Sequence, residues 1–165
     1  MSLLHIYDSS DWRIRETAWA RGGDHQVPLA SGNDFVSAMD ALVAAGSSYD
    51  RVLFETHGSP GMIVFGSVGI NTAFLRTLVP RYYTRITTQN ARIYFNGCNV
   101  AEGKEGWDFL EAAAQVFITP GGGQVFGQTS LGFGNPFNGH VVHLWGDTRT
   151  LFVDISGNIT ERFEQ

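Results

Sequence analysis

The chain has 165 residues, of which 43% are hydrophobic, and its formal net charge is −5 at pH 7. This length and composition favour one domain with a single core, comprising residues 1–165. The 11 lysines and arginines are scattered rather than clustered, so the sequence argues against nucleic-acid partners and against binding to anionic membranes.

Neither the first residues nor any later segment has the features of a targeting or membrane-spanning sequence. Residues 1–8 lack a basic start and a long apolar run, and no apolar stretch approaches about 18 residues. We therefore expect a soluble protein that is cytoplasmic or is an effector exported without a signal peptide. The single cysteine, Cys98, excludes an internal disulfide and fits either setting.

The first predicted elements are a short strand and a short helix. Residues 3–7 are apolar enough for a strand, and residues 8–11 (Asp-Ser-Ser-Asp) supply turn and helix-capping groups. Residues 12–20 then predict a helix. Residues 21–28 contain two glycines and a proline and are typical of a loop, in which His25 is expected to be solvent exposed.

A second helix and a buried strand follow. Apolar residues at steps of three and four predict a helix from Asn33, ended by Gly46, that covers one face of a sheet. Residues 49–56 predict a strand that is buried on both faces, as in a parallel sheet. His57 comes directly after it, and residues 62–65 predict a returning strand, so we expect His57 at the tip of a hairpin.

The middle of the chain contains a helix, a strand and a further helix. Residues 70–80 have an apolar face and predict a helix that ends near a proline. Residues 91–95 are β-branched and aromatic, and the polar, glycine-rich turn after them carries Cys98. Residues 107–118 show the clearest amphipathic helical pattern in the chain.

The C-terminal region differs in character from the rest. Residues 124–127 predict a further core strand, and the glycine-rich residues 128–139 predict a long loop. Short strands joined by turn residues then predict antiparallel hairpins between about 140 and 163, at residues 140–145, 150–155 and 159–163. The expected architecture is a three-layer α/β sandwich with a mainly parallel sheet and a C-terminal antiparallel region.

Two residues suited to nucleophilic catalysis follow predicted strands. If those strands are parallel neighbours, His57 and Cys98 emerge at the same edge of the sheet, where ligands bind in open α/β sheets. A cysteine reacts as its thiolate and needs a nearby base, so Cys98 is a candidate nucleophile and His57 a candidate general base. The backbone amides of Gly58 and Cys98 are candidates for an oxyanion hole.

The order of these motifs resembles the caspase-like cysteine peptidases, the group that contains caspases, gingipains, legumains and bacterial self-processing toxin domains. Residues 57–61 (His-Gly-Ser-Pro-Gly) and 97–101 (Gly-Cys-Asn-Val-Ala), followed by Gly103 and Gly106, are similar to a bacterial caspase-like domain of uncharacterised function that is often found at the head of large surface adhesins. The similarity covers about residues 50–130.

This resemblance implies a mainly parallel sheet flanked by helices. It also implies that His57 and Cys98 form a catalytic dyad without a third acid, and that the substrate is a peptide or protein, in some members the chain itself. No cofactor and no metal ion is expected, and no motif specifies the side chain recognised or an oligomeric state.

Two other interpretations remain open. A papain-like amidase would use Cys98 with His140, although Gly103 and Gly106 argue against the long helix that should begin at its cysteine. A catalytically inactive binding module that retains the caspase-like fold would need neither histidine. His140 and His143 are three residues apart on a predicted strand and so point to opposite faces, which argues against a shared metal site.

Overall fold

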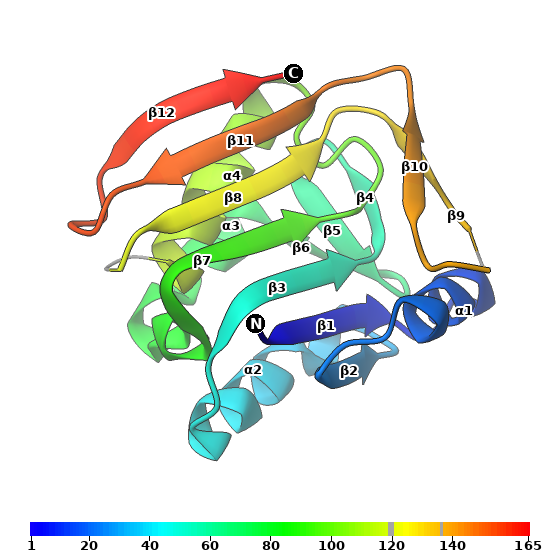
Figure 1. Cartoon of the computed structure of the whole chain (residues 1–165), viewed down its shortest axis with the longest axis horizontal. Coiled ribbons are helices and arrows are strands. Elements are labelled where there is room, and N and C mark those ends of the chain that lie inside the picture. The colour runs from blue at the N-terminus through cyan, green and yellow to red at the C-terminus, as the bar shows by residue number, and fades with distance from the viewer. Residues whose placement is uncertain (119–120, 136) are drawn as a thin grey trace.

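The computed structural model describes residues 1–118, 121–135 and 137–165. These residues form a mixed α/β domain around a seven-stranded sheet (Figure 1). In spatial order the strands are β12 (Ile159–Glu164), β11 (Thr148–Val153), β8 (Gly123–Gln128), β7 (Thr87–Phe95), β3 (Tyr49–Glu55), β1 (Leu3–Asp8) and β2 (His25–Leu29). The strands from β8 to β2 pair in parallel, whereas β11 and β12 extend the sheet in antiparallel pairing.

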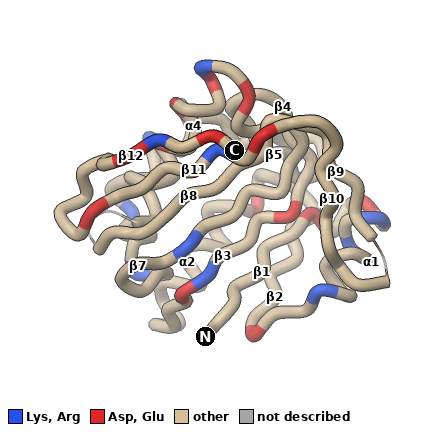
Figure 2. Tube along the Cα trace, turned by 45° about the horizontal axis from the view of Figure 1, so that its top comes forward, with Lys and Arg blue, Asp and Glu red and all other residues tan. Residues whose placement is uncertain are grey.

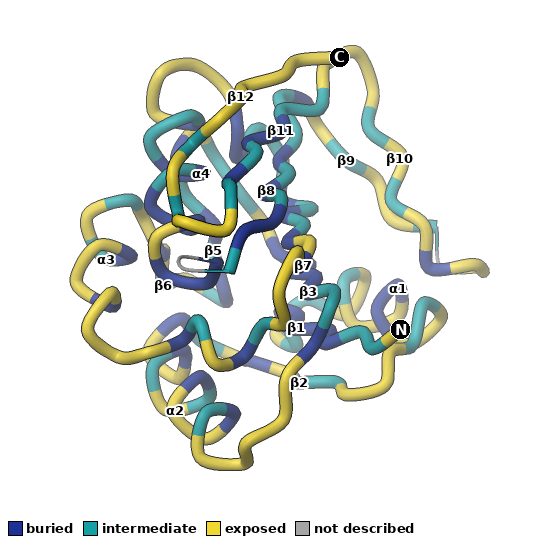
Figure 3. The backbone as a smooth tube through the Cα atoms, turned by 60° about the vertical axis from the view of Figure 1, so that its left-hand side comes forward, coloured by how far each residue is buried: buried dark blue, intermediate teal, exposed yellow. Residues whose placement is uncertain are grey.

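Helices cover the two faces of the sheet unequally. One face carries α2 (Phe35–Ala45), α3 (Thr72–Thr77) and α4 (Gly103–Phe117), together with the short 3₁₀ segments Gly32–Asp34, Val79–Arg81 and Tyr83–Ile86. Among the described residues, the other face carries only α1 (Trp12–Arg21) and a hairpin of β9 (Leu131–Gly134) and β10 (Val141–Leu144), which lie at one end of it (Figure 3). The expected three layers are therefore complete only at that end.

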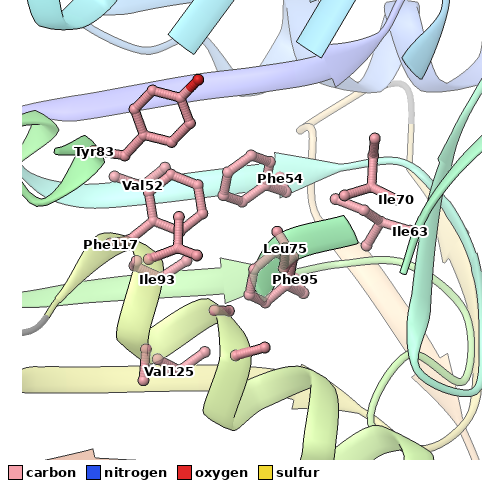
Figure 4. Close-up of a cluster of buried hydrophobic side chains, with 14 of the residues drawn as sticks. Val52, Phe54, Ile63, Ile70, Leu75, Tyr83, Ile93, Phe95, Phe117 and Val125 are labelled. Atoms are coloured by element: carbon pink, nitrogen blue, oxygen red, sulfur yellow. The ribbon is translucent and has the colours of Figure 1, made fainter. Parts of the chain in front are cut away.

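The hydrophobic core lies between the sheet and the three helices on its covered face (Figure 4). Because side chains alternate along a strand, one residue in two points into this core. The rings of Phe54 and Phe95 stack with centroids 4.9 Å apart, and Phe117 of α4 packs against Phe54 at 5.7 Å. The strand residues that contribute are Leu4, Ile6, Val52, Phe54, Ile93, Phe95, Val125, Leu151 and Val153.

The segment predicted as a loop at residues 21–28 is a strand in part, so that prediction is wrong. β2 pairs in parallel with β1, from His25 opposite Leu4 to Leu29 opposite Asp8. It forms one edge of the sheet, where Pro28 is tolerated because its missing N–H faces no further strand. The segment is a strand because it forms hydrogen bonds with β1, and its own residues do not show the alternating or apolar pattern from which a strand is predicted.

The hairpin after β3 also differs from the prediction. His57 begins β4 (His57–Ser59) and pairs with Val64 of β5 (Met62–Phe65), so it lies at the open end of the hairpin and not at its tip. A third strand, β6 (Val68–Asn71), completes a small antiparallel sheet. The helix predicted from residue 70 therefore begins two residues later, at Thr72 of α3. The side chain of Asn71 caps its N-terminus.

The C-terminal strands exist, but two of them have other partners than predicted. Residues 159–163 do return against residues 150–155 as a hairpin, β11 with β12. β10, however, pairs with β9, which lies in the segment predicted as a long loop at residues 128–139; residue 136 of that segment lies outside the described residues. β11 pairs instead with β8, because this pairing buries Leu151 and Val153 beside the parallel strands.

The helix predicted at residues 107–118 begins earlier, at Gly103. Gly106, predicted to interrupt a helix, lies within α4 and is buried. A Cβ atom on Gly106 would lie only 2.0 Å from the carbonyl carbon of Ala101. Glycine is therefore required at this position by the close approach of the Cys98 turn, which overrides its low helix propensity.

Replacing Gly106 by alanine is expected to lower the free energy of unfolding by roughly 1–3 kcal/mol. Alanine favours a helix by about 1 kcal/mol over glycine, but the added methyl group would push the helix off Ala101. Urea denaturation followed by circular dichroism measures the change. The matched control is Lys104→Ala in the same helix, whose side chain is 82% exposed and which should change stability by less than about 0.5 kcal/mol. Equal stability of the two variants would contradict the close contact.

No helix within the described residues is long and apolar enough to cross a membrane.

Candidate functional site

A cavity of about 380 Å³ lies at the carboxyl ends of the parallel strands. The start of α1 and the β9–β10 hairpin form two of its walls, and the ends of β3 and β7 contribute the residues between them (Figure 1). The residues that line it are Asp11, Trp12, Arg13, Ile14, Glu16, Thr17, Glu55, Thr56, His57, Asn96, Cys98, Gly132, Phe133, Gly134 and Val141. Both predicted catalytic side chains are among them.

The turn that carries Cys98 is held by backbone hydrogen bonds on both sides. The N–H of Asn96 donates to the carbonyl of Phe54 at 2.9 Å, which ties the turn to β3. The N–H of Asn99 donates to the carbonyl of Ser130 at 3.0 Å, which ties it to the segment after β8. Asn99 has a φ of 55°, a left-handed conformation that asparagine tolerates better than most residues. The thiol therefore sits on a turn of defined shape.

The sulfur of Cys98 is half-buried and has a backbone partner from β9. The N–H of Gly132 donates to Sγ at 3.3 Å, and the carbonyl oxygen of the same residue lies 3.8 Å from it. A hydrogen-bond donor at this distance is the kind of group that stabilises a thiolate once it has formed. The β9–β10 hairpin also limits access to the sulfur from this side.

His57 is held by a carboxylate that sequence reasoning did not select. Its Nε2 lies 2.8 Å from Oδ2 of Asp11, and the two side chains are 53% and 23% exposed. The other oxygen of Asp11, Oδ1, accepts the N–H of Arg13 at 2.8 Å and so caps the N-terminus of α1. One carboxylate thus fixes both the start of the helix and the orientation of the imidazole.

Opposing influences act on the pKa of Asp11. Partial burial is the largest of them and would raise this pKa, because it disfavours the charged carboxylate. The N–H of Arg13, together with the hydrogen bond and charge of His57, outweighs burial, so the pKa of Asp11 is lowered from its usual value. Asp11 is therefore ionised at neutral pH, where it can accept a hydrogen bond from His57.

The two glycine-containing turns are in direct backbone contact. A Cβ atom on Gly58 would lie 2.7 Å from the carbonyl oxygen of Cys98, and one on Gly97 would lie 3.1 Å from the carbonyl oxygen of His57. Any larger side chain would separate the turns. Gly58 supports this contact but does not line the cavity, whereas the N–H of Cys98 has no hydrogen-bond acceptor among the described residues.

A family model described as a domain of unknown function, DUF4347, matches residues 17–120 of the chain, which is more than half of its length. The chain belongs to this family. The searches of curated proteins and of solved structures each found no match. The part of the DUF4347 domain that the family model covers includes His57 and Cys98, whereas Asp11 and the β9–β10 hairpin lie outside it.

The other histidine candidates of this DUF4347 domain lie outside the cavity. His140 is exposed, and its backbone N–H donates to the side chain of Asn138 at 3.0 Å. His143 is on β10 and packs over Gly132, with both ring nitrogens buried; this burial outweighs the opposing effect of the Ser130 backbone and lowers the pKa of His143. Within the described ranges no three histidine, cysteine or acidic side chains are placed to share a metal ion.

A buried pair lies below the site and joins β1 to β3. Glu55 lines the cavity but is only 3% exposed, and its Oε2 lies 2.8 Å from Nε2 of the fully buried His5. The Nδ1 of His5 must donate to the carbonyl of Gly22, 2.9 Å away, because a carbonyl only accepts. Glu55 therefore has a fixed partner and helps to hold the strand that presents His57.

One signal in the sequence could have identified Asp11. It follows β1, and β1 lies beside β3 in the parallel sheet, so Asp11 emerges at the same edge as His57. The local sequence around Asp11 predicts only turn and helix-capping roles. The contact between Asp11 and His57 depends on the adjacency of two strands that are far apart in sequence.

Proposed function

We propose that this DUF4347 domain is a caspase-like cysteine peptidase in which Cys98 is the nucleophile and His57 the general base. The observation that supports this most is the shared cavity: both side chains line it, on turns whose backbones are in contact. Asp11, bound to Nε2 of His57, adds an orienting acid that the dyad of the family resemblance did not include.

The hydrogen bond to Asp11 selects the reactive form of the imidazole. The ionised carboxylate accepts a hydrogen bond from Nε2–H and so holds the proton on Nε2, which leaves Nδ1 as the nitrogen with a free lone pair. In the proposed mechanism Nδ1 takes the proton from the thiol of Cys98. The Gly132 N–H, already donating to the sulfur, then stabilises the thiolate.

The thiolate forms a bond to the carbonyl carbon of a peptide, and the N–H of Cys98 stabilises the negative oxygen. Gly58, the other predicted oxyanion donor, does not line the cavity and supports the site through its close contact with the Cys98 turn. Collapse of this intermediate breaks the C–N bond, and the imidazolium of His57 returns its proton to the leaving amine. Water then attacks the carbonyl carbon of the thioester and gives up a proton to His57. Collapse of this second intermediate breaks the C–S bond, which releases the carboxylic acid, and the imidazolium returns its proton to the sulfur of Cys98.

The geometry of β9 favours an extended peptide as the substrate. Gly132 directs both its N–H and its carbonyl towards Cys98, away from β10, so one edge of this strand faces the cavity. Gly134 lies two residues further along and directs its backbone groups to the same edge. A peptide can pair with such an edge as an added strand, which brings its carbonyl group to the sulfur.

A second candidate is a catalytically inactive caspase-like binding module. The observation that favours it is the position of β9, which lies against the sulfur and narrows the path to it. In that case the cavity would hold a peptide without cleaving it. The papain-like alternative has no comparable support, because His140 does not line the cavity.

The test is a comparison of the wild-type domain with a Cys98→Ala variant on a mixture of peptides prepared by digesting whole-cell protein. We expect new peptide termini, identified by mass spectrometry, only with the wild type. Binding of intact peptides by both proteins, without cleavage by either, would support the inactive module. Equal cleavage by both proteins would rule out Cys98 as the nucleophile.

A further inference from the structure

In the part of the chain that the structure describes, no helix or strand covers the face of the sheet opposite α2, α3 and α4 over β7, β8, β11 and β12. Figure 1 is viewed towards this face, and Figure 3 shows that α1 and the β9–β10 hairpin stand only at one end of it. We call the uncovered part the open face. Its aromatic side chains Tyr94, Phe126 and Phe152 are half-buried, and Phe163 is 45% exposed.

One row of the open face is mainly apolar. Residues opposite each other in neighbouring strands point to the same face, so the register places five side chains side by side across the sheet. The rings of Tyr94 and Phe126 stack with centroids 4.6 Å apart and an interplanar angle of 8°. In order from β3 to β12 the row consists of Leu53, Tyr94, Phe126, Thr150 and Phe163. Leu53, on β3 at the margin of the open face, and Thr150 are already buried in a single copy, at 3% and 6% exposed, so Tyr94, Phe126 and Phe163 supply the accessible apolar surface of this row.

The next row carries opposite charges at its two ends. In the same order it consists of Arg51, Arg92, Gln124, Phe152 and Glu161. Figure 2 shows the adjacent basic segments of β3 and β7. None of Arg51, Arg92 and Glu161 forms an ion pair with another described residue, and Nε of Arg51 is buried without a hydrogen-bond partner. Two unpaired arginines on neighbouring strands repel each other and favour an acidic partner.

We propose that the open face binds a second copy of this chain, face to face, about a two-fold axis that runs parallel to the strands over β8. β8 is the middle of the five strands concerned, so this rotation exchanges β3 with β12 and β7 with β11. Arg51 of each copy then faces Glu161 of the other, and Arg92 faces the ring of Phe152. The face is complementary to itself in charge, as an isologous interface requires.

The apolar row obeys the same symmetry. Phe126 lies at the axis and meets its own counterpart, Tyr94 packs over the row position of the buried Thr150, and the exposed Phe163 packs over that of the buried Leu53. Sheets pack face to face at about 10 Å, a spacing that these side chains fill. Five strands of this length cover at most roughly 500 Å² in each copy, or about 1,000 Å² in total, which is at the lower limit for a specific interface. An interface of this size fits a reversible dimer rather than a permanent one.

Charge reversal at the two ends of the charged row tests this arrangement. Sedimentation velocity between about 5 and 500 µM should show a concentration-dependent dimer for the wild type. Arg51→Glu and Glu161→Arg should each weaken self-association at least about tenfold, because each places like charges opposite each other. An equimolar mixture of the two variants should regain the dimer, because opposite charges then face each other at both ends of the row.

The control is Arg162→Glu, on the same strand but on the covered face, where Arg162 pairs with Glu111 of α4. It should dimerise like the wild type, and circular dichroism should confirm that all variants are folded. A wild type that is monomeric at every concentration would overturn the proposal. So would a mixture that remains monomeric, or single variants that associate as well as the wild type.

Discussion

Replacing His57 by alanine is expected to lower the rate of peptide cleavage by about 10²–10⁴-fold, the usual contribution of a general base. The reason is that Cys98 would lose the imidazole that takes its proton in the proposed mechanism. The rate is measured on the best peptide found with the wild type. Iodoacetamide labelling of Cys98 gives a second measurement that needs no substrate. Because an unassisted thiol is only a few per cent ionised at neutral pH, labelling should slow by up to about 30-fold.

The matched control is His140→Ala, which removes a histidine outside the cavity. It should leave both cleavage and labelling at the wild-type rate. If His140→Ala slowed labelling and His57→Ala did not, the papain-like interpretation would replace the present one. If labelling were slow in the wild type and in both variants, the thiol would be unassisted, as expected for an inactive binding module.

Asp11→Asn is expected to lower kcat by about 10²–10⁴-fold with little change in KM. The asparagine amide can donate a hydrogen bond to Nε2 of His57, which favours the tautomer with the proton on Nδ1. That tautomer cannot accept a proton from Cys98 through Nδ1. Asparagine caps a helix as well as aspartate does, so the start of α1 should be retained.

Two further variants separate orientation from stability. Asp11→Ala removes the helix cap as well, yet should lower kcat less than Asp11→Asn, because water can accept from Nε2 and restore the reactive tautomer. Asp34→Asn is the matched control: Asp34 precedes α2 but makes no capping hydrogen bond through its side chain. It should behave like the wild type. A greater loss in the alanine variant would indicate that Asp11 acts only through the fold.

The core strands were predictable because runs of adjacent apolar residues indicate a buried strand. β3 and β7 end in apolar and aromatic runs that no solvated segment would carry, and both were located within a few residues. β2 was not, since His25 and Pro28 give it no strand pattern and its hydrogen bonds come from β1. β10 was located but assigned to the wrong partner, because the turn residues before β11 resemble those of a hairpin.

The candidate site followed the same division. His57 and Cys98 could be selected because each follows a buried strand and adjoins glycine. Asp11 could not be selected, because the capping of α1 is a sufficient reason for an aspartate at this position in the local sequence. Its second oxygen reaches His57 only because β1 and β3 are neighbours.

The sequence by itself determined where the buried strands β3 and β7 end, that a histidine and a single thiol follow those two ends, and that the chain is acidic without a basic cluster. These properties depend on residues close together along the chain. Only the tertiary structure decided that His57 and not His140 shares the cavity with Cys98, that β9 lies against the sulfur, and that one face of the sheet is left open. Each of these depends on the order and register of strands, which is set by burying distant segments together.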